Sequence, residues 1–295
     1  MISQRAIGLT RRSALMCLAT AMVGRAAVAR NLDPKLVSLE TRDGLLTATF
    51  TDRVDDFELE AVMPELVARG VQSVVLRSTP VQDISPLAQL TKLRVLDICA
   101  THVRDLRPLA KLPALQSLNL QFLSVNDLSA LAGLRELEEL NIGGTEVTSL
   151  APLSKLTRMR HLTASVTKIN DLRPLAQLQH LESLDVGSTW VSDIRALNGF
   201  ASLKYLSLNG TPVSDIGVLR GMTTLRELNL VGTRVYNIDA LSTAVGLEVV
   251  DLEGTQVADV KSLALLPVLK SVNLGGSRVT DISPLASVPG LTIRR

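Results

Sequence analysis

Aromatic side chains and arginine are the residues of this chain best suited to contact another protein. The 295 residues contain one tryptophan and two tyrosines, and hot spots in protein interfaces favour Trp, Tyr and Arg. Polar side chains beside such anchors would complete an interface. We therefore predict a recognition patch of Trp190, Tyr205, Ser207, Glu227, Asn229, Arg234 and Tyr236. A scattered set of solvated side chains is the alternative interpretation.

Residues that could support catalysis or bind a metal ion are poorly placed in this sequence. None of the three histidines stands at metal-ligand spacing from a cysteine or from a second histidine: His102, His161 and His180. No serine lies in the Gly-x-Ser-x-Gly context of a nucleophile elbow. Asp97, Asp185 and Asp251 are expected to be separated by several strands, too far apart for a calcium site. We predict no enzymatic activity, no metal and no cofactor.

The elements that position these residues come from a sequence that repeats every 22 residues without insertion or deletion. Counting in this step from Thr79 reaches Thr101, Leu123, Thr145, Thr167, Thr189, Thr211, Thr233, Thr255 and Ser277. A fixed period in this range is typical of a solenoid. Apolar residues return after three positions and then after two, as in Leu203, Leu206 and Leu208. The second step is strand spacing, so each repeat is predicted to contribute one short strand.

A short helical turn is predicted after each strand. Aspartate precedes an apolar residue in most repeats: Asp83, Asp105, Asp127, Asp171, Asp193, Asp215, Asp259 and Asp281. Its oxygen can accept from free backbone N–H groups of a first helical turn, where the prolines that often follow are tolerated. Because only about nine residues then remain before the next strand, we expect 3-10 turns. The threonine after each strand is expected to bond the backbone of the adjacent coil.

The repeat is similar to the bacterial 22-residue leucine-rich repeat of internalin-like proteins. The shared pattern is Leu-x-x-Leu-x-Leu-x-x-Thr-x-Val-x-Asp-Ile-x-Pro-Leu-Ala-x-Leu, and it extends from Val71 to Leu291. The family's usual Asn at the strand's end is Thr in most repeats here. The resemblance implies an α/β solenoid, an arc with a concave parallel β-sheet and short 3-10 turns on the convex side. It also implies a protein-recognition role, and it transfers no active site.

The sequence before the repeats divides into two predicted segments. Residues 1–29 resemble a twin-arginine signal peptide, because Arg11 and Arg12 precede an apolar run, and Ala29 ends a small-x-small cleavage site. Residues 30–70 are predicted to form an N-terminal cap of a hairpin and a helix that ends at Gly70. Pro64 counts against an uninterrupted helix. The solenoid of about ten repeats then occupies residues 71–295.

Charge and export together limit the kind of partner. The formal net charge of +2 becomes −2 once the four arginines of residues 1–29 are removed, which leaves 27 basic and 29 acidic residues. This balance argues against nucleic acid. The apolar run is too short for a stable membrane anchor after cleavage. We predict a periplasmic or secreted, non-enzymatic module that binds a protein partner through its concave face or rim. The alternative is a secreted virulence-type effector that recognises a host protein inside a host cell.

Overall fold

The computed structural model describes residues 32–295, of which Asp33–Arg295 form one compact unit. The predicted signal peptide, with Arg11, Arg12 and the cleavage position at Ala29, lies outside the described residues. Within residues 32–295, no helix is long and apolar enough to cross a membrane.

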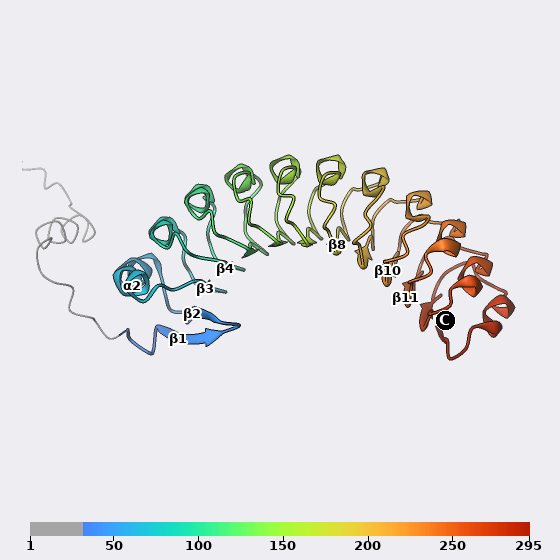
Figure 1. The fold of residues 1–295 in the computed structure, drawn as a ribbon, viewed down its shortest axis with the longest axis horizontal. Helices are drawn as coiled ribbons and strands as arrows, with labels where there is room; N and C mark the ends of the chain where they lie inside the picture. The colour runs from blue at the N-terminus through green and yellow to red at the C-terminus, as the bar shows by residue number, and fades with distance from the viewer. Residues whose placement is uncertain (1–31) are drawn as a thin grey trace, which may run out of the picture. The chain divides into compact units, whose positions relative to one another are not determined.

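A single open sheet of thirteen strands runs through this unit in sequence order. Its strands are β1 (Val37–Arg42), β2 (Leu45–Phe50), β3 (Ser73–Val75), β4 (Val95–Asp97), β5 (Ser117–Asn119), β6 (Glu139–Asn141), β7 (His161–Thr163), β8 (Ser183–Asp185), β9 (Tyr205–Ser207), β10 (Glu227–Asn229), β11 (Val249–Asp251), β12 (Ser271–Asn273) and β13 (Thr292–Arg294). Every neighbouring pair is parallel except β1 and β2. The strands line the inner, concave side of the arc, and the turns form its outer side (Figure 1).

The hairpin and the helix expected before the repeats are both present. Asp43 and Gly44 connect β1 and β2 with φ values of 49° and 76°, as a two-residue hairpin turn requires. Helix α2 (Asp56–Arg69) is capped by Asp55 and ends at the left-handed Gly70. The helix continues through Pro64, the residue that counted against it. Pro64 is exposed, so the carbonyl that loses its hydrogen bond there can be hydrated.

Stacked leucines fill the interior of the solenoid. The middle residue of each strand points inward, and Leu184, Leu206 and Leu228 are at most 1% exposed. Two further inward residues of one repeat, Val213 and Leu219, are completely buried. A single coil could not bury such a set alone, so the stacking of neighbouring coils stabilises the fold. The solenoid fold predicted from the sequence is therefore confirmed.

Short 3-10 turns form the convex side, as the spacing predicted. They are η2 (Ser85–Gln89), η3 (Arg107–Lys111), η4 (Ser129–Leu131), η5 (Ala151–Leu153), η6 (Arg173–Leu175), η7 (Arg195–Leu197), η8 (Gly217–Leu219), η9 (Asp239–Thr243), η10 (Lys261–Leu265) and η11 (Ser283–Ser287). In eight of the ten turns, an aspartate accepts a hydrogen bond from the backbone N–H of the first residue of the turn. Ser149 and Asn237 do so in η5 and η9. In η7, for example, Arg195 N donates to Asp193 Oδ1 over 2.9 Å.

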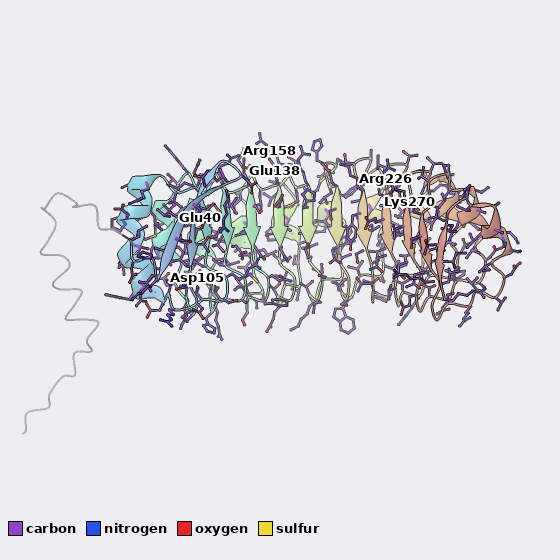
Figure 2. The ribbon with its side chains drawn as sticks, turned by 90° about the horizontal axis from the view of Figure 1, so that it is seen from below. Glu40, Asp105, Glu138, Arg158, Arg226 and Lys270 are labelled. Atoms are coloured by element: carbon purple, nitrogen blue, oxygen red, sulfur yellow. The ribbon has the colours of Figure 1, made fainter. Side chains whose placement is uncertain are left out.

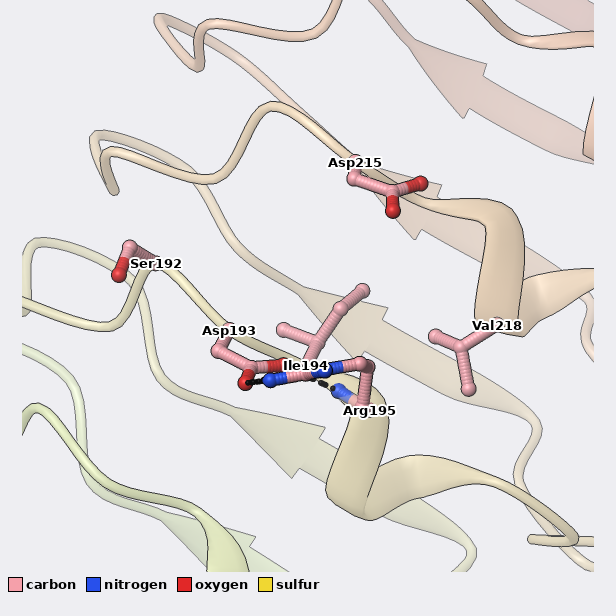
Figure 3. Close-up of a pocket in the computed structure, with 6 residues that line it drawn as sticks. All are labelled: Ser192, Asp193, Ile194, Arg195, Asp215 and Val218. Atoms are coloured by element: carbon pink, nitrogen blue, oxygen red, sulfur yellow. Dashed lines mark hydrogen bonds and ion pairs between the residues drawn. The ribbon is translucent and has the colours of Figure 1, made fainter.

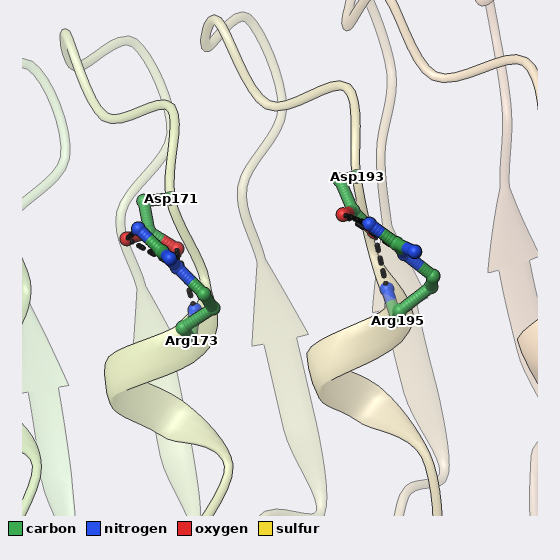
Figure 4. Close-up of polar contacts among 4 residues, drawn as sticks. All are labelled: Asp171, Arg173, Asp193 and Arg195. Atoms are coloured by element: carbon green, nitrogen blue, oxygen red, sulfur yellow. Dashed lines mark hydrogen bonds and ion pairs between the residues drawn. The ribbon is translucent and has the colours of Figure 1, made fainter.

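In η3, η6 and η7 the same carboxylate also binds the arginine that begins the turn. Arg195 and Arg173 fold back onto Asp193 and Asp171, with shortest N–O distances of 2.6 and 2.8 Å (Figure 4). Hydrogen bonds from the Arg195 side chain and then from its backbone lower the pKa of Asp193 to about 2. Asp105 beside Arg107 has the same arrangement, and its pKa is also lowered to about 2. The convex aspartates are thus occupied with local structure.

The threonine after each strand bonds differently from the expectation. The Thr189 hydroxyl donates to the Val186 carbonyl over 2.7 Å, and that carbonyl lies three residues back in its own coil. Thr211 bonds Leu208 in the same way. The contact with the adjacent coil comes instead from the backbone, since Trp190 N donates to Ile169 O over 2.9 Å. The threonine therefore closes the bend of its own repeat, where it is buried.

Candidate recognition surfaces

Three rows of side chains border the concave sheet, and each row takes one residue from each repeat. The charged row, which precedes the strands, consists of Glu138, Arg160, Glu182, Lys204, Arg226, Glu248 and Lys270. The facing row begins the strands and includes Ser117, Glu139, His161, Ser183, Tyr205, Glu227 and Val249. The polar row ends the strands and consists of Asp97, Asn119, Asn141, Thr163, Asp185, Ser207, Asn229, Asp251 and Asn273. The three rows differ in how many of their polar side chains are left without an ion pair or a hydrogen bond.

The charged row largely neutralises itself. Glu182 lies between Arg160 and Lys204, with N–O distances of 2.7 and 2.6 Å, and Glu248 lies between Arg226 and Lys270. Hydrogen bonds from Lys204 and then Arg160 lower the pKa of Glu182. Glu138, Arg226 and Lys270 lie along one edge of the sheet, and Asp105 lies along the opposite edge (Figure 2). Since these charges are paired and exposed, this edge offers few free charges to a partner.

The polar row is occupied by the bend that follows each strand. The oxygens of its aspartate and asparagine side chains accept backbone N–H groups two residues further on. Gly187 N donates to Asp185 Oδ1 over 2.9 Å, and Val231 N donates to Asn229 Oδ1 over 3.0 Å. The aspartates, asparagines and backbone N–H groups of this row therefore satisfy one another. The carboxylates of this row, such as Asp185 and Asp251, therefore serve first to hold the bends.

Tyr205 is the aromatic member of the facing row. It is half-buried on strand β9 and lies in register with Ser183 on β8 and Glu227 on β10. Burial raises the pKa of the Tyr205 hydroxyl, and a hydrogen bond with Ser207 partly offsets that rise. Ser207 is only 2% exposed, and its one O–H donates to Asn209 Oδ1 over 2.7 Å. Ser207 thus connects Tyr205 to Asn209 through hydrogen bonds.

The structure divides the predicted patch between two surfaces. Tyr205, Ser207, Glu227 and Asn229 belong to the concave strands. Trp190, Arg234 and Tyr236 follow the bend at the far end of the strands and are exposed. Five residues separate the start of a strand from its bend, which corresponds to roughly 16 Å of extended chain. A small ligand could not touch both groups, whereas a protein could.

Sequence reasoning overlooked several exposed residues. His161 and Val249 lie in the facing row, as Tyr205 does. Phe122 and Val166 lie at the bends after β5 and β7 and are 59% and 61% exposed. The sequence did hold a signal for them, because other repeats carry glycine at the position of Phe122 and Val166.

Neither hollow found on the convex side has the character of an active site. One is open and lined by Ser192, Asp193, Ile194, Arg195, Asp215 and Val218 (Figure 3). Both of its carboxylates already accept backbone N–H groups. In the part of the chain that the structure describes, no group of three His, Cys, Asp or Glu side chains could hold a metal ion. The absence of catalysis remains a prediction.

Comparisons with known proteins identify the fold. No family model matches the sequence, and no curated protein matches it. Among solved structures, an internalin from Listeria monocytogenes is 26% identical with a TM-score of 0.69, over 82% of this chain and 77% of that chain. The similarity confirms a leucine-rich repeat solenoid of internalin-like fold and suggests an interaction module.

Two more distant structures share the fold alone. The plant peptide hormone receptor RGFR1 in complex with RGF2 is 12% identical with a TM-score of 0.61, over 86% of this chain and 51% of that chain. A TLR13–ssRNA13 complex is 19% identical with a TM-score of 0.64, over 80% of this chain and 37% of that chain. Solenoids of this shape thus occur in complexes with ligands of different chemical classes.

Proposed function

We propose that this chain is a non-enzymatic recognition module that binds a protein partner through its concave face. The observation that carries the proposal is the facing row, whose exposed members Glu139, His161 and Glu227 lie along the same row as the half-buried Tyr205. The rows on either side of it are occupied by ion pairs and backbone hydrogen bonds. Within the facing row Ser117 donates to Glu139 over 2.9 Å, so His161 and Glu227 are free polar side chains that this row offers to a partner.

A protein suits this face better than a nucleic acid does. Glu139 and Glu227 are exposed on the facing row, and Asp185 and Asp251 stand beside them in the polar row. The cations of the neighbouring charged row are paired with carboxylates. Phosphate backbones require unpaired Lys and Arg side chains, whereas Arg160, Lys204 and Lys270 beside this part of the face are held in ion pairs. A partner segment with basic and apolar groups would be complementary to the acids and to Tyr205.

Variants of exposed residues test this proposal. We expect Tyr205→Ala and Glu227→Gln to weaken the crosslinking of the full chain to its partner in the producing cells, because each removes a free concave contact. Trp190→Ala tests the contribution of the rim. Gln177→Ala on the convex side is the control, since Gln177 is exposed away from the strands. Crosslinking at wild-type levels by all three site variants would refute recognition through this patch.

We further propose that the chain is exported to the periplasm or secreted, on the sequence signal of Arg11 and Arg12. Replacing both arginines with lysine should leave the precursor uncleaved in the cytoplasmic fraction. The alternative, a virulence-type effector delivered into a host cell, instead predicts an unchanged distribution in this variant and appearance of the chain inside host cells.

A further inference from the structure

A row of left-handed residues follows the strands on the edge opposite the charged row. It consists of Ser78, Ala100, Phe122, Gly144, Val166, Ser188, Gly210, Gly232, Gly254 and Gly276, with φ between 54° and 69°. The row is closely stacked, because a Cβ added to Gly254 would lie 3.6 Å from the Gly232 Cα. Glycine occupies five of these ten positions, so the bend itself requires no side chain.

Side chains in this conformation have an energetic cost. The left-handed region disfavours a residue with a Cβ by about 1–2 kcal/mol, and a β-branched residue there is a true outlier. Val166 is such a residue, with φ of 57°, and Phe122 has φ of 61°. Strained positions that the fold does not require point to a function.

The two costly side chains are exposed and apolar, which burial in the core does not explain. Phe122 is 59% exposed and Val166 is 61% exposed. A Cβ at Gly144, between them, would lie 2.4 Å from Phe122 Cδ1, so the ring rests against that glycine. Trp190, in the repeat after Val166, is 69% exposed on the same edge. We call Phe122, Gly144, Val166 and Trp190 the apolar ridge.

We propose that the apolar ridge docks a short uncharged segment of a partner protein, which inserts two apolar side chains against Phe122 and Val166. This inference rests on the proposed function of protein recognition and assigns it a second surface. Because the two residues are two repeats apart, their contacts are separated by roughly 10 Å at the ordinary strand spacing.

The charges around the ridge favour an uncharged segment. Lys168 and Glu146 lie beside it and pair over 3.4 Å, and Asp171 and Asp193 further out are each bound by an arginine. A partner would therefore meet little net charge. A membrane surface is disfavoured, because the ridge lacks the unpaired basic side chains that attract anionic lipid.

The area of the ridge favours a short segment over a second copy of the chain. A fully exposed aromatic side chain can bury about 150–250 Å², so the partly exposed Phe122, Val166 and Trp190 offer about 400 Å² together. A stable protein pair buries about 800 Å² on each partner. The ridge has the size of the largest apolar patches on ordinary monomers, which are often functional.

Peptide selection tests the proposal. A random displayed peptide library is selected on the full chain and counter-selected on the Phe122→Gly/Val166→Gly double variant. We expect uncharged peptides with two apolar residues, whose affinity falls about ten-fold in either single variant and changes little with salt. Ala100→Gly is the matched control, because it makes the same backbone change at an exposed residue with φ of 55°. Its affinity should equal that of the wild type.

Three results would overturn the inference: no peptide is enriched, enriched peptides bind the double variant as tightly as the wild type, or neutral phosphatidylcholine vesicles bind in a Phe122-dependent manner instead of peptides. The proposed function can be distinguished from this inference by a separate experiment. If crosslinking of the cellular partner is lost in Tyr205→Ala and unchanged in Phe122→Gly, concave recognition stands and the ridge is not a docking surface.

Discussion

Replacing Gly187 with alanine should disturb the support beneath Tyr205. A Cβ at this position would lie 2.0 Å from Asn209 Oδ1 and 2.7 Å from Asn209 Cγ, so the Asn209 side chain must move away. The Ser207 hydroxyl then loses the acceptor that it reaches over 2.7 Å. Since Ser207 is buried, the unsatisfied hydroxyl costs about 1–3 kcal/mol. Alanine recovers about 0.4–1 kcal/mol by restricting the unfolded chain.

The net expectation for Gly187→Ala is a loss of about 1 kcal/mol in the free energy of unfolding. Gly133→Ala is the matched control, because nothing lies within 4 Å of its added Cβ. Neither glycine has a positive φ, so strain does not enter, and the control should gain about 0.4–1 kcal/mol. Urea unfolding measures the free energy of unfolding of both variants, and equal m-values make the two comparable. A Gly187→Ala protein as stable as Gly133→Ala would refute the proposed packing of Asn209 over Gly187.

Two other substitutions test the capping and the core. Arg195→Ala removes the main cause of the low Asp193 pKa, so NMR titration should show this pKa rising from about 2 toward about 3.9, with Asp105 as the unchanged control. The stability that Asp193 contributes is present above its unfolded-state pKa and is lost as pH falls toward about 2, so the variant should lose it at higher pH. Leu206→Ala, at a fully buried position, should cost about 2–5 kcal/mol in urea unfolding, whereas a loss below about 1 kcal/mol would contradict the stacked core.

The fold could be predicted because a repeat specifies its core through spacing alone. Leu206 and Leu208 had to share a face, and no single coil could bury them, so stacking followed from the residues. The aspartate before most turns indicated a capping bond, and the structure shows the expected bond from Arg195 N to Asp193. The Thr189 bond was predicted wrongly, because a hydroxyl at a bend can reach its own coil as easily as the next.

The recognition surfaces were harder to predict because free and occupied side chains look alike in a sequence. Asp185 and Glu227 are both carboxylates on concave strands, yet Asp185 accepts the Gly187 N–H and Glu227 stands exposed. Ser207 ends a concave strand, in the polar row, and is nevertheless buried, because Asn209 and Tyr205 lie close to it. Only the hydrogen bonds and the burial seen in the structure distinguish these cases.

Comparison of the repeats with one another would have revealed the apolar ridge. Glycine at 144, 210, 232, 254 and 276 marks a bend that requires positive φ, and each repeat adopts the same bend. Phe122 and Val166 therefore had to adopt a conformation that disfavours them, whatever their own preference. A core position that departs from its neighbours can be explained by packing. Packing does not explain an exposed position that replaces glycine with a side chain at an energetic cost. Binding is then the stronger interpretation.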